Sequence, residues 1–117
     1  MLAYATMEGV AFQFADCVAA QQEVGARPAR FTVVGGGTRS RLWLRLLSTA
    51  LDRPVSLIDG ADIAGPRGAA RLAAVAAGAP ASVLGEPIAP TGLVSPEMAL
   101  AEAIAPRREA MRAMIMG

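Results

Sequence analysis

The sequence contains neither lysine nor histidine, and all eleven of its basic residues are arginine. These absences exclude a Schiff-base lysine, a phosphate-loop lysine, a Ser/His/Asp triad and a histidine metal site within the chain. Ten acidic residues bring the net charge to +1, and the charges are dispersed along the sequence. This nearly neutral, dispersed charge gives no indication of nucleic acid or of an anionic membrane as a partner.

Cysteine is also scarce, and no hydrophobic run is long. Cys17 is the only cysteine, so an internal disulfide is impossible, and we expect it to lie buried in a helix as a small hydrophobic residue. The longest uncharged run, residues 72–85, is too short to span a bilayer and contains Gly78 and Pro80. No signal-peptide pattern precedes it. We therefore expect a cytoplasmic protein without a membrane span.

Apolar residues recur at helical spacing near the amino terminus, which predicts a helix from Ala3 to about Val24 that Gly25 ends. The predicted apolar face consists of Met7, Val10, Ala11, Phe14 and Val18. Because this face begins almost at Met1, with no capping residue before it, we expect the chain to start inside a domain.

Strands and helices alternate after this helix. The expected elements are a strand over 30–34, a helix over 41–51, a strand over 54–58 and a helix over 67–77. Ser40 or Thr38 is available to cap the first of these helices, and Pro66 to open the second. The order αβαβα predicts an α/β layer with largely parallel strands. Two strands are too few for a stable sheet, so further strands are either unrecognised in this sequence or lie outside it.

The last third of the sequence has a different composition. Residues 80–96 are rich in Pro, Gly and Ser and predict a connector. Residues 97–117 predict a helical tail that Pro106 divides into two short helices. The second short helix is expected to present Met111, Met114 and Ile115 as its apolar face.

Three consecutive glycines join the first predicted strand to the next helix. Gly35, Gly36 and Gly37 allow the backbone to approach a ligand, and the free amides of a helix start can bind a phosphate or orient a polar ring edge. This junction suits a nucleotide. The spacing alone leaves a second interpretation open, because glycine turns join many strands to helices without binding a ligand. Arg39 and Arg41 beside the helix start either face phosphate or are solvated charges.

The segment from Val33 to Trp43 resembles the adenosine-binding motif of the FGGY carbohydrate kinases. Three further segments, 8–12, 54–55 and 68–73, resemble the same family in order and spacing. The resemblance covers about residues 3–78. It implies that residues 1–79 form the C-terminal part of an actin-like, ribonuclease H-like ATPase domain that uses ATP and Mg²⁺.

The same resemblance implies roles for individual residues. Gly36 and Gly37 would lie against the nucleotide, and Gly35 would shape the turn. Ser40 would lie near adenine or ribose, whereas Trp43 would belong to the core.

Outside the loop, the resemblance implies that Gly68 and Ala69 permit close helix packing around the ATP cleft. The sequence departs from the family pattern at Arg45 and Thr49, where xylulose kinase-like members commonly carry Gln and Asp.

The resemblance therefore implies an ATP-binding segment of an enzyme that transfers the ATP γ-phosphate to a sugar or polyol hydroxyl. The acceptor that the resemblance favours is D-xylulose, which would become D-xylulose 5-phosphate. Nothing in this sequence matches the family's catalytic Asp or its sugar-binding residues. We assign no catalytic residue and no metal ligand, and expect the chain alone to be inactive. Surface or turn roles are expected for the aspartates Asp16, Asp52, Asp59 and Asp62.

The sequence leaves two alternatives to this interpretation. One is a non-catalytic interaction module that pairs with itself or with the missing kinase portion through exposed apolar surface. The other, a Rossmann dinucleotide binder, is disfavoured because Gly35, Gly36 and Gly37 lack the later glycine of that fingerprint.

Overall fold

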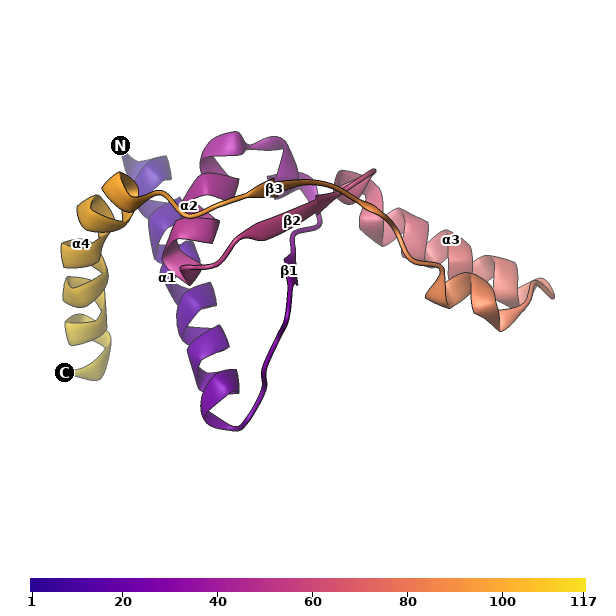
Figure 1. Cartoon of the computed structure of the whole chain (residues 1–117), viewed down its shortest axis with the longest axis horizontal. Coiled ribbons are helices and arrows are strands. Elements are labelled where there is room, and N and C mark those ends of the chain that lie inside the picture. Colours follow the sequence, from indigo (N-terminus) through magenta and orange to yellow (C-terminus); the bar gives the residue numbers. More distant parts are fainter.

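The computed structural model describes residues 1–117, an elongated α/β arrangement of four α-helices and a three-stranded sheet (Figure 1). The helices are α1 (Leu2–Glu23), α2 (Arg41–Leu51), α3 (Ala64–Ala76) and α4 (Met98–Met116). The strands are β1 (Phe31–Thr32), β2 (Val55–Ile58) and β3 (Pro90–Val94), and three short 3-10 turns are η1 (Gly36–Arg39), η2 (Ala61–Ile63) and η3 (Ala81–Gly85). No helix is both long enough and apolar enough to cross a membrane.

The sheet has the order β1-β2-β3 and is mixed. β1 and β2 are parallel, as the sequence predicts, and α2 makes the crossover between them. β3 lies antiparallel to β2, with Val94 opposite Val55 and Leu93 opposite Ser56. The segment 80–96, predicted to be a connector, therefore supplies a third strand. β1 is shorter than the predicted strand over 30–34.

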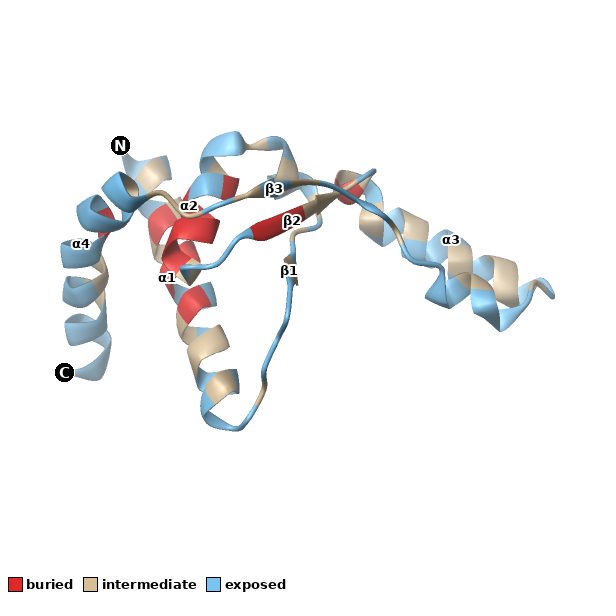
Figure 2. Cartoon of the chain, viewed as in Figure 1, coloured by how far each residue is buried: buried red, intermediate tan, exposed pale blue.

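The core lies where α1, α2 and α4 meet (Figure 2). Its six buried members are Ala11, Phe12, Ala15, Leu46, Ala50 and Ile104. On α1 the buried face runs through Glu8, Ala11, Phe12 and Ala15, so the predicted stripe was wrong at Val10 and Phe14, which are exposed. Cys17 is also exposed, contrary to the expectation that it is buried.

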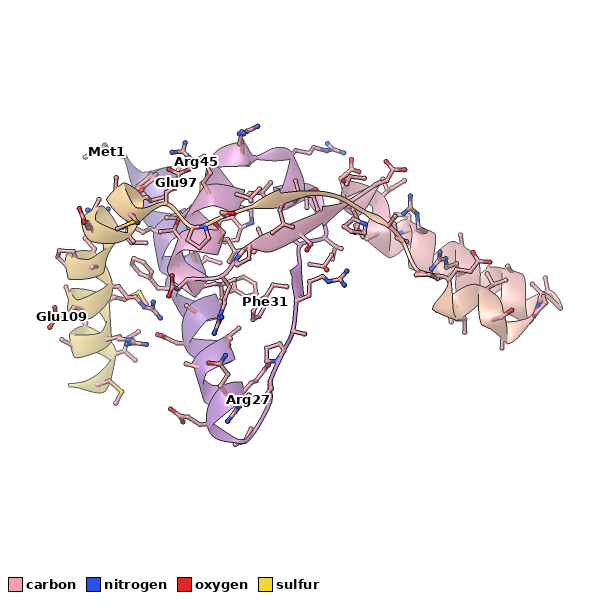
Figure 3. The ribbon with its side chains drawn as sticks, in the orientation of Figure 1. Met1, Arg27, Phe31, Arg45, Glu97 and Glu109 are labelled. Carbon is pink, nitrogen blue, oxygen red and sulfur yellow. The ribbon has the colours of Figure 1, made fainter.

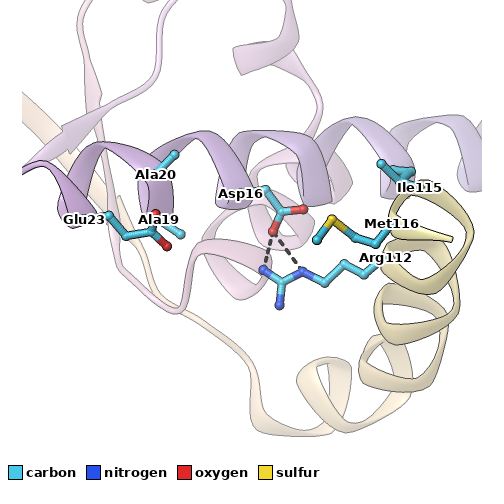
Figure 4. A pocket seen from close by; sticks show the side chains of 7 residues that line it. All are labelled: Asp16, Ala19, Ala20, Glu23, Arg112, Ile115 and Met116. Carbon is cyan, nitrogen blue, oxygen red and sulfur yellow. Dashed lines mark hydrogen bonds and ion pairs between the residues drawn. The ribbon is translucent and has the colours of Figure 1, made fainter.

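Helix α4 runs without interruption through Pro106, so the prediction of two short helices was wrong. Arginines that follow the proline tie α4 to α1. Arg107 forms two hydrogen bonds with the buried carboxylate of Glu8, at 2.7 and 2.6 Å. Arg108 and Arg112 both pair with Asp16, and Figure 4 shows the Asp16–Arg112 contact. Ile104 before the proline is buried in the core, and the arginines after it pair with α1. Contacts on both sides of Pro106 therefore offset the backbone hydrogen bond that a proline cannot donate.

Helix α3 and η3 extend away from the three helices as an arm, at the right of Figure 1. No residue of α3 is buried. A Cβ built at Gly68 would meet no atom within 4 Å, so nothing in this chain packs closely there. The close packing expected at Gly68 and Ala69 is therefore absent within residues 1–117.

Candidate functional site

The candidate site is the glycine loop between β1 and α2. Gly35 has φ +95°, a conformation that disfavours any residue with a side chain. Its N–H donates to the carbonyl oxygen of Ala61 at 2.7 Å, and its own carbonyl accepts from the Thr38 hydroxyl at 2.7 Å. Gly35 thus shapes and anchors the turn, in line with the role that the sequence predicts for it.

Gly36 and Gly37 follow as the first residues of η1. The first amides of a helical turn have no acceptor within it, and neither amide donates to a turn or loop carbonyl. A Cβ at Gly36 would meet nothing within 4 Å, whereas one at Gly37 would lie 3.0 Å from the Trp43 ring. Gly36 therefore leaves its backbone accessible to a ligand, and Gly37 allows the indole to approach.

Ser40 begins α2 as its N-cap. Its side-chain oxygen accepts from the backbone N–H of Trp43 at 3.2 Å, which satisfies one of the free amides of the helix start. Trp43 packs against the core and makes an edge-to-face contact with Phe14, so it is a core residue as expected. The Ser40 hydroxyl lies beside the glycine loop and also fixes the orientation of α2.

A shallow pocket of about 440 Å³ lies at the carboxyl end of β2, between η1, η2 and β3. It is lined by 57–62, Thr38, Arg39 and Thr91. Ligands of open α/β sheets bind at this end of the strands. Sequence reasoning missed 57–62 and Thr91 as lining residues, because only the pairing of distant segments brings them to the loop.

Arg39 crosses from the loop to η2. It donates to the carboxylate of Asp62 from Nε at 3.1 Å and from Nη2 at 2.8 Å. The hydrogen bonds from Arg39 hold the pKa of Asp62 below its usual range. The Arg39 side chain is otherwise exposed, so Arg39 is a solvent-facing charge that the carboxylate of Asp62 partly offsets.

Arg45 and Thr49, two positions that depart from the family pattern, both contact Glu97. Arg45 forms a two-pronged ion pair with Glu97, and the two side chains lie together in Figure 3. The Thr49 hydroxyl accepts from the Glu97 backbone N–H at 3.1 Å. Glu97 is the N-cap residue of α4. Both departures therefore fix the start of α4 to α2.

The aspartates take structural roles. Asp16 and Asp62 are in ion pairs, Asp52 ends α2 with φ 52°, and the Asp59 carbonyl accepts from Arg67. The chain has no cluster of three or more His, Cys, Asp or Glu side chains suited to a metal ion.

Comparisons with known proteins agree with this arrangement. The chain is 37% identical over 76 residues to the xylulose kinase of Escherichia coli K12, covering 65% of this chain and 16% of that protein. It is 38% identical over 78 residues to the erythritol kinase of Brucella abortus, covering 67% of this chain and 14% of that protein. The chain thus spans less than a fifth of these relatives.

Two solved structures are similar over nearly the whole chain. A xylulose kinase from Brucella ovis superposes with a TM-score of 0.74 and 36% identity, covering 97% of this chain and 24% of that one. A xylulose kinase from Rhodospirillum rubrum superposes with a TM-score of 0.64 and 30% identity, covering 92% of this chain and 22% of that one. Both likenesses cover more of the chain than the sequence resemblance, which is limited to about residues 3–78. Residues 1–77 match the model of the FGGY family of carbohydrate kinases, C-terminal domain. The chain therefore belongs to this family and is a part of its C-terminal domain.

Proposed function

We propose that this chain is the nucleotide-binding segment of an ATP-dependent sugar kinase, with an actin-like, ribonuclease H-like domain in the complete protein. The observation that carries the proposal is the loop from Gly35 to Ser40. It combines an accessible backbone at Gly36 with a capped helix start, at the carboxyl ends of two parallel strands. Membership of a carbohydrate kinase family makes ATP the nucleotide that this loop would hold.

The residues present suit such a ligand. The amides of Gly36 and Gly37 would donate to polar atoms of the nucleotide, and the amino terminus of α2 favours negative charge nearby. Ser40 keeps α2 in place through its cap and would lie near adenine or ribose. ATP, together with Mg²⁺, supplies the phosphoryl group that is transferred.

The acceptor is proposed to be a sugar or polyol hydroxyl, with xylulose favoured. Relatives named xylulose kinase come from Escherichia coli and Klebsiella pneumoniae, and another relative is named erythritol kinase. The base and most sugar contacts would come from the kinase polypeptide outside this segment, in the cytoplasm where ATP is available. We therefore expect the 117-residue chain by itself to bind nucleotide without phosphorylating sugar.

The test is calorimetric titration of the purified chain with Mg-ATP, beside two matched variants. Gly36→Val fills open space at the loop, and Gly85→Val fills equally open space in η3, remote from the loop. Because valine at 36 would obstruct the approach of a nucleotide without disturbing its own neighbours, we expect at least tenfold weaker binding. Gly85→Val should bind as the unaltered chain does. Equal binding by the Gly36→Val variant would contradict the proposed site.

A further inference from the structure

Trp43 contacts both ends of the short segment that runs from Gly37 to Ser40. Its backbone N–H donates to the Ser40 side chain at 3.2 Å, and the Ser40 N–H donates in turn to the Gly37 carbonyl at 3.0 Å. A Cβ built at Gly37 would lie 3.0 Å from Cδ1 and 3.0 Å from Nε1 of the Trp43 ring. The backbone of Trp43 therefore fixes the end of this segment, and the edge of its indole ring lies against the beginning.

The indole ring is itself held by the body of the molecule. Phe14 of α1 packs edge to face against it, with the two ring centroids 6.4 Å apart, and Trp43 packs against the buried core. Helices α1 and α2 lie side by side there (Figure 1). Side chains in a close-packed interior have little room to move. A side chain added at Gly37 would therefore displace the loop more readily than the ring.

The two adjacent glycines of the loop have different surroundings. Neither Gly36 nor Gly37 has a positive φ, so the backbone allows an alanine at both positions. A Cβ at Gly36 would meet no atom within 4 Å, whereas one at Gly37 would meet the indole. Ordinary carbon contacts are about 3.5–4.0 Å, so an alanine at position 37 would move the loop by about 0.5 Å. Only position 37 needs glycine for a reason inside this chain.

We propose that Trp43 is a positioning residue for the nucleotide. The edge of its indole ring sets the place of the Gly37 backbone, and the lack of a side chain at Gly37 serves this contact instead of the approach of the ligand. The inference rests on the proposed function, which assigns the amides of Gly36 and Gly37 to the nucleotide. Hydrogen bonds depend on distance and angle, so a displaced loop would bind the nucleotide more weakly. Trp43 acts through Gly37.

A double-mutant cycle on the 117-residue chain tests this role by calorimetric titration with Mg-ATP. Gly37→Ala should weaken binding at least about tenfold, because its methyl group meets the indole. Trp43→Leu removes the ring and should weaken binding at least about fivefold by itself. In the Trp43→Leu background, adding Gly37→Ala should cost less than about twofold, because the obstacle is gone. A methyl group that blocked the nucleotide directly would cost the same in both backgrounds.

Gly36→Ala supplies the matched control, since its methyl group meets no atom of the chain. Its effect on Mg-ATP affinity should be the same with and without Trp43→Leu. Urea denaturation of each variant, followed by circular dichroism, checks that affinities are compared between folded chains. If Trp43→Leu does not fold, Trp43→Met takes its place in the cycle, because the flexible thioether side chain fills irregular gaps.

A measurement on the unaltered chain needs no variant. Trp43 is the only tryptophan, so its indole N–H gives a single proton resonance. A nuclear Overhauser effect should join the indole protons at Cδ1 and Nε1 to one α-proton of Gly37. The indole N–H resonance should also shift during titration with Mg-ATP, with the dissociation constant that calorimetry gives. A tryptophan that only stabilised the core would show no such shift.

The outcomes separate this inference from the proposed function. Equal costs of Gly37→Ala in the two backgrounds would overturn the positioning role and leave the ATP site standing. Full affinity in the folded Trp43→Leu variant, an absent Overhauser effect, or an unshifted indole resonance with ATP bound would do the same. If the folded, unaltered chain binds no Mg-ATP, the proposed function fails and the positioning role fails with it.

Discussion

Replacement of Leu46 by alanine should destabilise the fold more than any comparable change on the same helix. Leu46 is completely buried, and its core neighbours include Ala11, Ala15 and Ala50. An alanine has no side-chain rotamer that can move into the space left by leucine, so the cavity would stay largely open. The cost of a Leu→Ala change in a core is about 2–5 kcal/mol and rises with the volume of the cavity left behind, so we expect a loss of about 3–5 kcal/mol here.

Leu42 supplies the matched control. It lies one turn before Leu46 on α2 and is 43% exposed, so Leu42→Ala should cost less than about 1 kcal/mol. Urea denaturation followed by circular dichroism would give both free energies of unfolding, provided that the slope against urea is unchanged. A loss for Leu46→Ala no larger than that for Leu42→Ala would refute the placement of α2 in the three-helix core.

Two other substitutions test local features. Ser40→Ala removes the acceptor of the Trp43 N–H and should lower the free energy of unfolding by about 1 kcal/mol. Ser40→Asp keeps an acceptor and should retain most of the free energy of unfolding. Equal losses for the two variants in urea denaturation would contradict the capping role. Hydrogen bonds from Arg112, with Arg108, hold the pKa of Asp16 below its usual value. A lowered pKa means that Asp16 contributes its full stability above about pH 4 and loses it as the pH falls through the lowered pKa. Arg112→Gln should raise the pKa of Asp16 toward its usual value in an NMR titration of the carboxyl carbon, and an unchanged titration would show that the pair is not formed.

The elements closest to the glycine loop could be predicted from local sequence. Helix α2 has the predicted bounds, 41–51, because its apolar periodicity is strong and Ser40 is a good cap. β2 and the parallel relation of β1 to β2 also follow the prediction. The turn at Gly35 could be anticipated because consecutive glycines indicate a turn, and the positive φ of Gly35 is a conformation that favours glycine.

What could not be predicted depends on distant contacts. The segment that forms β3 reads locally as a turn, since Pro90 and Gly92 are poor strand formers, and pairing with β2 makes it a strand. The polar Glu8 joins the buried face of α1 because Arg107, far along the chain, supplies its partner. The pocket lining at 57–62 and Thr91 likewise required the assembled sheet, which local periodicity cannot supply.

The pairing of Glu8 with Arg107 also sets the order in which the chain can fold during its synthesis. The two residues are 99 positions apart, and Ile104 completes the core that Ala11 and Phe12 begin. At about 5–20 residues per second, the ribosome would add Arg107 roughly 5–20 s after Glu8. Until α4 has left the exit tunnel, the part of α1 that contacts α4, including Glu8, remains open to solvent and to chaperones. A pause in translation before Met98 would prolong this exposure, and a pause before Phe31 would leave α1 without both α2 and α4.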